Sequence, residues 1–224
     1  MGYYIDLEKI TIKDYQIKLE SAYLPPSRMV LKEKLDERFG YFEQIGISNV
    51  KELIQILKTK DKFAELSKVA CFSVDYLTIL LRELNSTLPK PNKIKDFSGI
   101  SNDTVDRLNK IGIKNTVKLF DMVLNAKSRK ELAENTGVTD IEILELTKLS
   151  DLSRIKWCGV TFARMLYELG IDTVEKASKV DPEKLHTSIN VLNKEKKIYK
   201  GQIGLNDMKI FVNAAKEIPL EIEY

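Results

Sequence analysis

The feature that most constrains this chain is a nine-residue phrase that occurs three times. Each copy has an aliphatic residue, a glycine, an isoleucine and, three positions after the glycine, an Asn or Thr; the copies are Ile45–Leu53, Ile111–Leu119 and Leu169–Ala177. The three glycines, Gly46, Gly112 and Gly170, stand 66 and then 58 positions apart. Such internal similarity indicates one supersecondary unit used repeatedly.

Each phrase predicts a helix, a tight turn and a second helix. Apolar residues recur at helical spacing before the glycine, as in Phe39, Phe42 and Ile45. A glycine ends a helix readily in the left-handed conformation, and the residue after it then packs back on the helix. The expected contacts are Phe42 with Ile47, Leu108 with Ile113, and Leu166 with Ile171. The next helices should be capped by Asn49, Asn115 and Thr173, with Glu52 completing a capping box in the first copy.

Local signals between the phrases place further helices and boundaries. Thr139 and Glu142 form a second capping box, Asp181-Pro182 starts a helix, and Gly204 precedes the last one. A long helix is predicted from Ser27 through Leu35, after Pro25-Pro26, and Tyr3 to Ile12 favours an extended segment. The proline-rich stretch Leu88 to Asn92 cannot be helical. We expect an all-α chain with an N-terminal extension at 1–24, a diverged repeat at 25–88, and repeats at 94–150 and 151–220.

Composition excludes several classes of protein. Lys plus Arg is 36 against 33 for Asp plus Glu, so the net charge of +3 permits a nucleic-acid partner without arguing for one. Cys71 and Cys158 lack metal-ligand spacing, and no apolar run approaches the ~18 residues of a membrane span. His186, the sole histidine, has no partners for a triad. We expect a cytoplasmic binding protein with no catalytic residues, no metal, no cofactor and no membrane contact.

From Ile94 onward the chain resembles a known family. The motifs that carry the resemblance are Asp151-Leu152-Ser153-Arg154-Ile155-Lys156-Trp157-Cys158-Gly159-Val160, the third glycine phrase, Asp181-Pro182, and Val191 to Lys197. They are similar to the second half of a family of paired helix-hairpin-helix-like domains, domain of unknown function number four thousand three hundred and thirty-two. Asp96 to Leu149 is similar to its first half. The resemblance implies a tandem helix-hairpin-helix-like fold and, weakly, nucleic-acid binding.

The hairpins that this resemblance implies should lie 13 positions before each phrase glycine. In helix-hairpin-helix modules two glycines let backbone amides approach a phosphate at a helix N-terminus. The second copy has Gly99-Ile100-Ser101 and the third has Trp157-Cys158-Gly159, so each keeps one glycine. The first copy has Glu33-Lys34-Leu35, which reads as continuous helix.

Two functions remain open at this point. One is sequence-independent binding of DNA or RNA through hairpin amides and neighbouring cations, although acidic residues such as Asp96 and Asp103 lie among them. Its candidate residues are Lys95, Gly99, Ile100, Ser101, Asn102, Arg154, Lys156, Cys158, Gly159, Val160, Thr161 and Arg164. The other is a protein-interaction scaffold without nucleic-acid contact, anchored by Trp157, the only tryptophan. The cationic run Asn193 to Lys200 is best interpreted as a solvated face.

Overall fold

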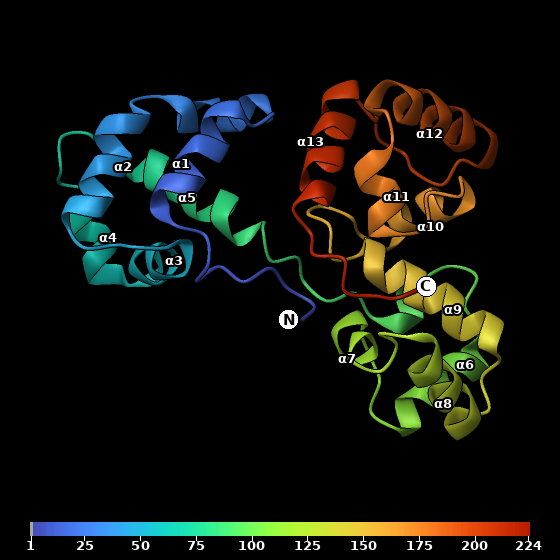
Figure 1. Ribbon diagram of the computed structural model, residues 1–224. Helices are drawn as coiled ribbons and strands as arrows, with labels where there is room; N and C mark the ends of the chain where they lie inside the picture. Colours follow the sequence, from blue (N-terminus) through green and yellow to red (C-terminus); the bar gives the residue numbers. More distant parts are fainter. Residues whose placement is uncertain (1) are drawn as a thin grey trace. The chain divides into compact units, whose positions relative to one another are not determined.

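The structure is a computed structural model that describes residues 2–224. The described residues form helices joined by turns and contain no strand, which confirms the predicted all-α class (Figure 1). They divide into two compact units. The C-terminal unit comprises residues 2–5 and 89–224, and the N-terminal unit comprises residues 6–88.

The N-terminal unit is a small bundle around an aromatic core. Its helices are α1 (Ile12–Ser21), η1 (Pro26–Lys32), α2 (Leu35–Gln44), α3 (Val50–Lys58), α4 (Lys60–Leu66) and α5 (Val74–Asn85). The α2 rings of Phe39 and Phe42 meet edge to face, and Phe42 stacks on Phe72, which stacks on Tyr76. These rings are all buried and together hold α2 against α5.

The C-terminal unit has two hydrophobic clusters that share one helix. Its helices are η2 (Ile94–Asp96), α6 (Asn102–Lys110), α7 (Thr116–Phe120), α8 (Ala126–Thr136), α9 (Asp140–Leu152), α10 (Val160–Glu168), α11 (Val174–Lys179), α12 (Pro182–Lys196) and α13 (Leu205–Lys216). Ile143 and Leu146 of α9 pack in the first cluster with α6, α7 and α8, whereas Leu149 and Leu152 pack in the second with α10 to α13. The expected boundary at 150/151 therefore falls inside α9.

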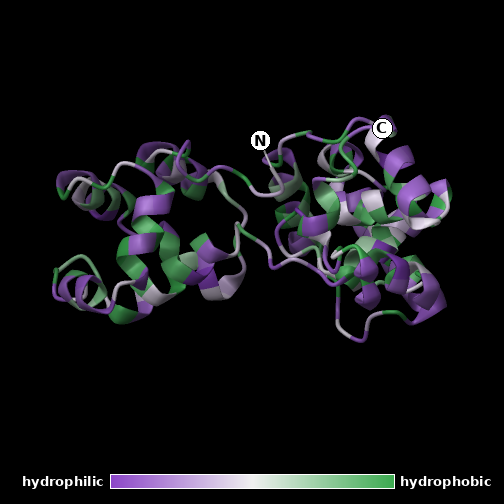
Figure 2. Ribbon diagram, turned by 90° about the horizontal axis from the view of Figure 1, so that it is seen from below, coloured by the Kyte–Doolittle hydropathy of each residue, from purple (hydrophilic) through white to green (hydrophobic). Residues whose placement is uncertain are grey.

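Polar and apolar residues mix along nearly every helix, as Figure 2 shows, so each helix has apolar residues to bury. The helices are 5 to 15 residues long where they are α-helical. Isolated helices of this length are marginal in water, so packing at the turns supplies their stability.

The three phrase glycines end their helices as predicted. Gly46, Gly112 and Gly170 have φ of 83°, 84° and 75°. In each case the amide of the following isoleucine donates to a carbonyl five residues back: Ile47 to Phe42, Ile113 to Leu108 and Ile171 to Leu166, all at 3.0 Å. These are the hydrogen bonds of a helix that ends with a left-handed residue, and they confirm the predicted pairs.

The predicted caps are also present, with one exception. The side chains of Asn49, Asn115 and Thr173 accept from the amides of Glu52, Lys118 and Lys176. Thr139 with Glu142 forms the predicted capping box, and Asp181 caps α12. Glu52 does not complete the predicted capping box in full: the main partners of its carboxylate are the amide and hydroxyl of Ser48, both at 2.8 Å.

The long helix predicted from Ser27 is wrong. The chain forms the 3₁₀ helix η1 and restarts as α2 after Lys34, whose φ is +49°. Arg38 stabilises this break, because its Nη1 donates to the carbonyls of Val30 and Glu33 and its Nε donates to that of Cys71. A turn therefore exists at Glu33-Lys34-Leu35, where the sequence pattern predicts continuous helix and no hairpin.

Extended segments brace two of the glycine turns. The amide of Ile12 donates to Ser48 and Val50 donates to Ile10, and in the same pattern Ile94 donates to Lys114 and Thr116 donates to Asn92. At the third turn the corresponding amide, that of Val174, donates to the carboxylate of Asp151 at 3.0 Å. The expected extended segment at Tyr3 to Ile12 is not a strand; it makes a single bridge at Thr11, and α1 follows it at once.

Substitution of two nearby glycines, Gly40 and Gly46, measures the effect of helix propensity on stability separately from that of backbone strain. Gly46 has φ +83°, Gly40 lies inside α2, and an added Cβ would meet nothing within 4 Å at either position. We expect Gly46→Ala to lower the free energy of unfolding by about 1–2 kcal/mol, because an L residue is strained there. Gly40→Ala should raise it by about 0.5–1 kcal/mol. Urea unfolding followed by circular dichroism checks both, and changes of the same sign would contradict the role assigned to Gly46.

Candidate functional site

The two hairpins of the C-terminal unit turn through a left-handed residue. Gly99 has φ +87° before α6, and Trp157 has φ +64° before α10. Ser101 caps α6 by accepting from the amide of Thr104, and Gly159 is the N-cap residue of α10. A left-handed conformation costs a tryptophan about 1–3 kcal/mol, so its surroundings must hold it in place.

Arg154 is buried in the core of the unit and does not reach the surface. Only 1% of it is exposed. Its Nη1 pairs with Asp151 Oδ1 at 2.8 Å, its Nε and Nη2 donate to the carbonyls of Tyr3 and Pro219 at 3.1 and 2.8 Å, and it lies over the Phe120 ring. The expectation that Arg154 contacts a phosphate is therefore wrong, because each side of the guanidinium already has a partner within the fold.

Arg164 is also largely buried, but its guanidinium has fewer partners, since its buried Nε and Nη2 form no hydrogen bond with the described residues. It is 8% exposed, its Nη2 lies 2.7 Å from Glu145 Oε1, and it lies over the Tyr167 ring. Its guanidinium also fills the space beside Gly99, where an added Cβ would come within 3.3 Å of Nη2. Arg164 thus packs against the Gly99 hairpin. Contrary to the sequence-based expectation, it is not exposed to a ligand.

The remaining candidates fall into three groups. Exposed residues are Lys95, Gly99, Ser101, Asn102, Gly159 and Thr161, and half-buried ones are Ile100, Lys156 and Val160. Cys158 is buried and lies outside the reach of a ligand. Burial also raises the pKa of its thiol, which keeps it protonated and weakly nucleophilic.

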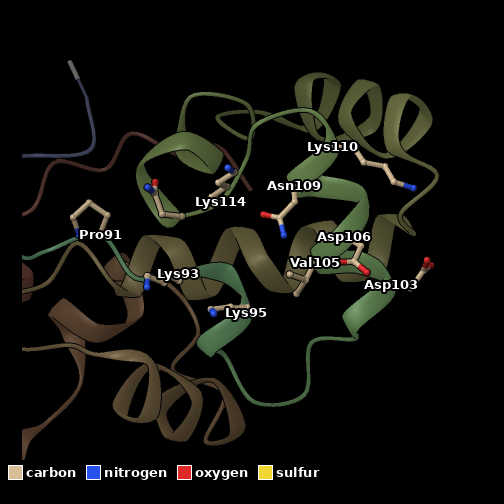
Figure 3. Close-up of a pocket in the computed structure, with 10 residues that line it drawn as sticks. Pro91, Lys93, Lys95, Asp103, Val105, Asp106, Asn109, Lys110 and Lys114 are labelled. Atoms are coloured by element: carbon tan, nitrogen blue, oxygen red, sulfur yellow. The ribbon is translucent and has the colours of Figure 1, made fainter.

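A groove beside the Gly99 hairpin brings the candidate Lys95 together with three lysines that the sequence did not suggest, Lys93, Lys110 and Lys114. It has a volume of about 920 Å³, and its lining residues are Pro91, Lys93, Lys95, Asp103, Val105, Asp106, Asn109, Lys110, Lys114 and Asn115 (Figure 3). They come from the segment around η2, from α6 and from the connection to α7. Hydrogen bonds between residues 92–94 and 114–116 bring these segments together.

The charge of this groove is positive. None of its four lysines has an ion-pair partner within 4.0 Å among the residues that the structure describes. Asp103 is paired with Arg107 at 2.6 Å, so Asp106 is the one lining acid without an ion-pair partner among the described residues. The groove can therefore attract an anion, most strongly at low ionic strength.

The helix that follows the Gly99 hairpin, α6, is joined to α9 by a polar contact. The hydroxyl of Thr104 in α6 donates to Glu142 Oε1 at 2.6 Å. This hydrogen bond and that from Thr139 lower the pKa of Glu142, so the contact is charged near neutral pH. It fixes the start of α6, where the exposed hairpin residues Ser101 and Asn102 lie.

Comparison with known families agrees with the resemblance noted in the sequence. The model of a domain of unknown function (DUF4332) matches residues 98–218, which is more than half of the chain. The chain belongs to this family. The DUF4332 match lies wholly within the C-terminal unit and includes both hairpins, Lys110 and Lys114, while Lys93 and Lys95 precede it.

The other comparisons add no relative. No curated protein and no solved structure matches the DUF4332 chain. Among residues 2–224, no group of His, Cys, Asp and Glu is arranged to hold a metal ion. Within the same range, no helix has the length and apolar character needed to cross a bilayer.

Two candidate cations of the DUF4332 unit can be compared to test the role of burial. We expect Arg154→Met to lower the free energy of unfolding by about 3–5 kcal/mol, because it leaves the buried Asp151 without its counter-charge. Lys95→Met, at an exposed position, should change it by no more than about 0.5 kcal/mol. Urea denaturation measures both, and a loss below about 1 kcal/mol for Arg154→Met would show that the pair is not structural.

Proposed function

We propose that the C-terminal unit binds nucleic acid without catalysis, by its phosphate backbone, and that the lysine groove is the binding site. The observation that carries the proposal is that Lys93, Lys95, Lys110 and Lys114 all line one groove, in which only one acid, Asp106, lacks an ion-pair partner among the described residues. The whole chain is nearly balanced at +3, so this local excess is not a reflection of overall composition. A polyanion is the ligand that such a surface favours.

The position of the groove supports the proposal. It runs along α6 as far as Asp103, which directly follows the exposed hairpin residues Ser101 and Asn102 in the sequence. A phosphate in the groove would lie close to the N-terminal end of α6, whose helix dipole favours an anion. We propose that this hairpin serves as a helix-hairpin-helix-like element, with the lysines supplying the charge that Arg154 and Arg164 do not.

The binding proposed here is independent of base sequence. Lysine ammonium groups contact phosphates as point charges and read no base edge. Affinity should therefore fall steeply with salt, by a slope of about 0.9 per phosphate contact on duplex DNA in a plot of log affinity against log salt concentration.

Charge reversal in the groove tests this function. We expect Lys93→Glu with Lys114→Glu to weaken binding of labelled duplex and single-stranded oligonucleotides and to make the duplex salt slope shallower by about 1.8, because two phosphate contacts are lost. Fluorescence anisotropy of the full-length protein at several salt concentrations measures both quantities.

The control is a double variant with the same change of charge elsewhere in the unit. Lys127→Glu with Lys130→Glu, on the exposed face of α8, also takes the net charge from +3 to −1. It should keep most of the affinity and the original slope. Absence of binding at roughly 50 mM salt, or an equal loss in both double variants, would exclude the lysine groove as a nucleic-acid site and favour a protein partner.

A further inference from the structure

A second groove lies on the other side of the extended segment 91–93. The side chains of Pro91 and Lys93 line the lysine groove, whereas Asn92 between them lines this one, since successive side chains of an extended chain point to opposite sides. The second groove has a volume of about 570 Å³, within the range of small-molecule sites. We call it the tryptophan groove; its lining residues are Asn92, Lys156, Trp157, Gly159, Val160, Thr161, Phe162, Met165, Tyr199, Gln202, Ile203, Asp207, Met208 and Phe211.

The tryptophan groove has an apolar floor and exposed aromatic residues among its lining. Met165, Met208 and Phe211 are buried beneath it. Trp157 and Tyr199 remain 45% and 49% exposed. Two exposed rings on one groove offer flat apolar faces to a flat ligand.

The backbone under Trp157 is held in a conformation that favours glycine. At the corresponding place in the second hairpin stands Gly99, with φ +87°, while Trp157 adopts φ +64°. A residue persists in such a conformation only where the surrounding structure holds it there. The turn at Trp157 thus carries an exposed indole beside the groove.

Tyr199 is fixed by a different set of contacts. Asn193 of α12 accepts from its amide at 2.7 Å and donates to its carbonyl at 2.9 Å. The loop that follows is tied to α12 at Ile203, whose carbonyl lies 3.0 Å from His186 Nε2. Gly201 leaves room for the tyrosine ring, since an added Cβ would come within 2.6 Å of it. The backbone that carries this ring is therefore ordered in advance of any ligand.

The charge around the indole selects among flat ligands. Lys156 Nζ lies over one face of the Trp157 ring, 4.5 Å from its centre, so a stacking base would use the other face. A base stacked near this ring would carry its own phosphate toward that ammonium group. Lys93 of the lysine groove directly follows Asn92 of the tryptophan groove in the sequence. The lysine groove therefore offers further positive charge for the adjoining phosphates.

We infer that the tryptophan groove binds an unpaired base of a single-stranded nucleic acid, stacked on Trp157, while Lys156 and the lysine groove contact its phosphates. This inference rests on the proposed function and adds the class of strand to it. A duplex hides the faces of its bases, so only a single strand can fill both grooves. Stacking on aromatic rings beside a cationic track is the general mode of sequence-tolerant single-strand binding.

Trp157 reports on its own site, because it is the only tryptophan of the chain. We expect a 15-mer of deoxythymidine to quench its fluorescence on titration into the full-length protein, and a duplex of equal length to bind with little quenching. The anisotropy of labelled strands, measured in parallel, gives the two affinities.

The variant that isolates the ring is Trp157→Gly, since glycine accepts φ +64° and the turn should be kept. It should lower single-strand affinity by about 5- to 150-fold, the range for one stacked base, and leave duplex affinity unchanged. Tyr23→Ala removes an aromatic ring of similar exposure, 47%, from the N-terminal unit and should alter neither affinity. Circular dichroism of each variant confirms that the fold is intact.

The outcomes separate this inference from the proposed function. If single and double strands both bind through Lys93 and Lys114 but neither quenching nor Trp157→Gly distinguishes them, base stacking is wrong and phosphate binding stands. If neither strand binds the unmodified protein, both proposals fail. If Trp157→Gly weakens duplex and single strand equally, the ring contacts the backbone and the inference is overturned.

Discussion

The architecture of this chain depends on residues that end a helix in the left-handed conformation. Its helices are too short to be stable alone, so each must be turned back on a neighbour before its apolar side can be buried. Gly46, Gly112 and Gly170 do this with the same pair of hydrogen bonds, one from the glycine amide and one from the amide of the following isoleucine, both to carbonyls of the helix just completed. Because the turn is set by the backbone, the helices around it can vary in sequence while the geometry is kept.

A second constraint appears where this pattern changes. At the first two glycine turns the amide that opens the next helix donates to a backbone carbonyl of an extended segment, Ile10 or Asn92. At the third the carboxylate of Asp151 accepts this hydrogen bond and also one from the Tyr224 hydroxyl. A buried carboxylate needs a counter-charge, and Arg154 supplies it. At the third turn the Asp151 carboxylate thus takes the place of the backbone carbonyl that an extended segment supplies at the other two, and Arg154 balances its charge.

The parts of the fold that were predictable are those decided by neighbours in sequence. Glycine terminators, their caps and Asp181-Pro182 act within one turn of helix, so a local pattern reveals them. The break at Lys34 was missed because no glycine or proline marks it and a distant side chain, Arg38, stabilises it. The site was harder for the same reason: Arg154 and Arg164 resemble surface cations until the fold buries them, and Lys93 and Lys114 meet only because residues 92–94 pair with 114–116. Trp157 was recognised as a hairpin residue, whereas the groove beside it needs α13 and the Tyr199 loop, which lie far along the chain.

The hydrogen-bond partners of Arg154 determine which residues a recombinant fragment of the domain must include. The family match covers 98–218, yet two carbonyls that satisfy this guanidinium, those of Tyr3 and Pro219, lie outside it on either side. A recombinant fragment with those limits would leave buried N–H groups of Arg154 without acceptors. Each would lower the free energy of unfolding by about 1–3 kcal/mol or more. The opening residues of the chain are thus part of a domain from which residues 6–88 separate them in sequence. An expression fragment that preserves the domain must carry both the first few residues and the tail.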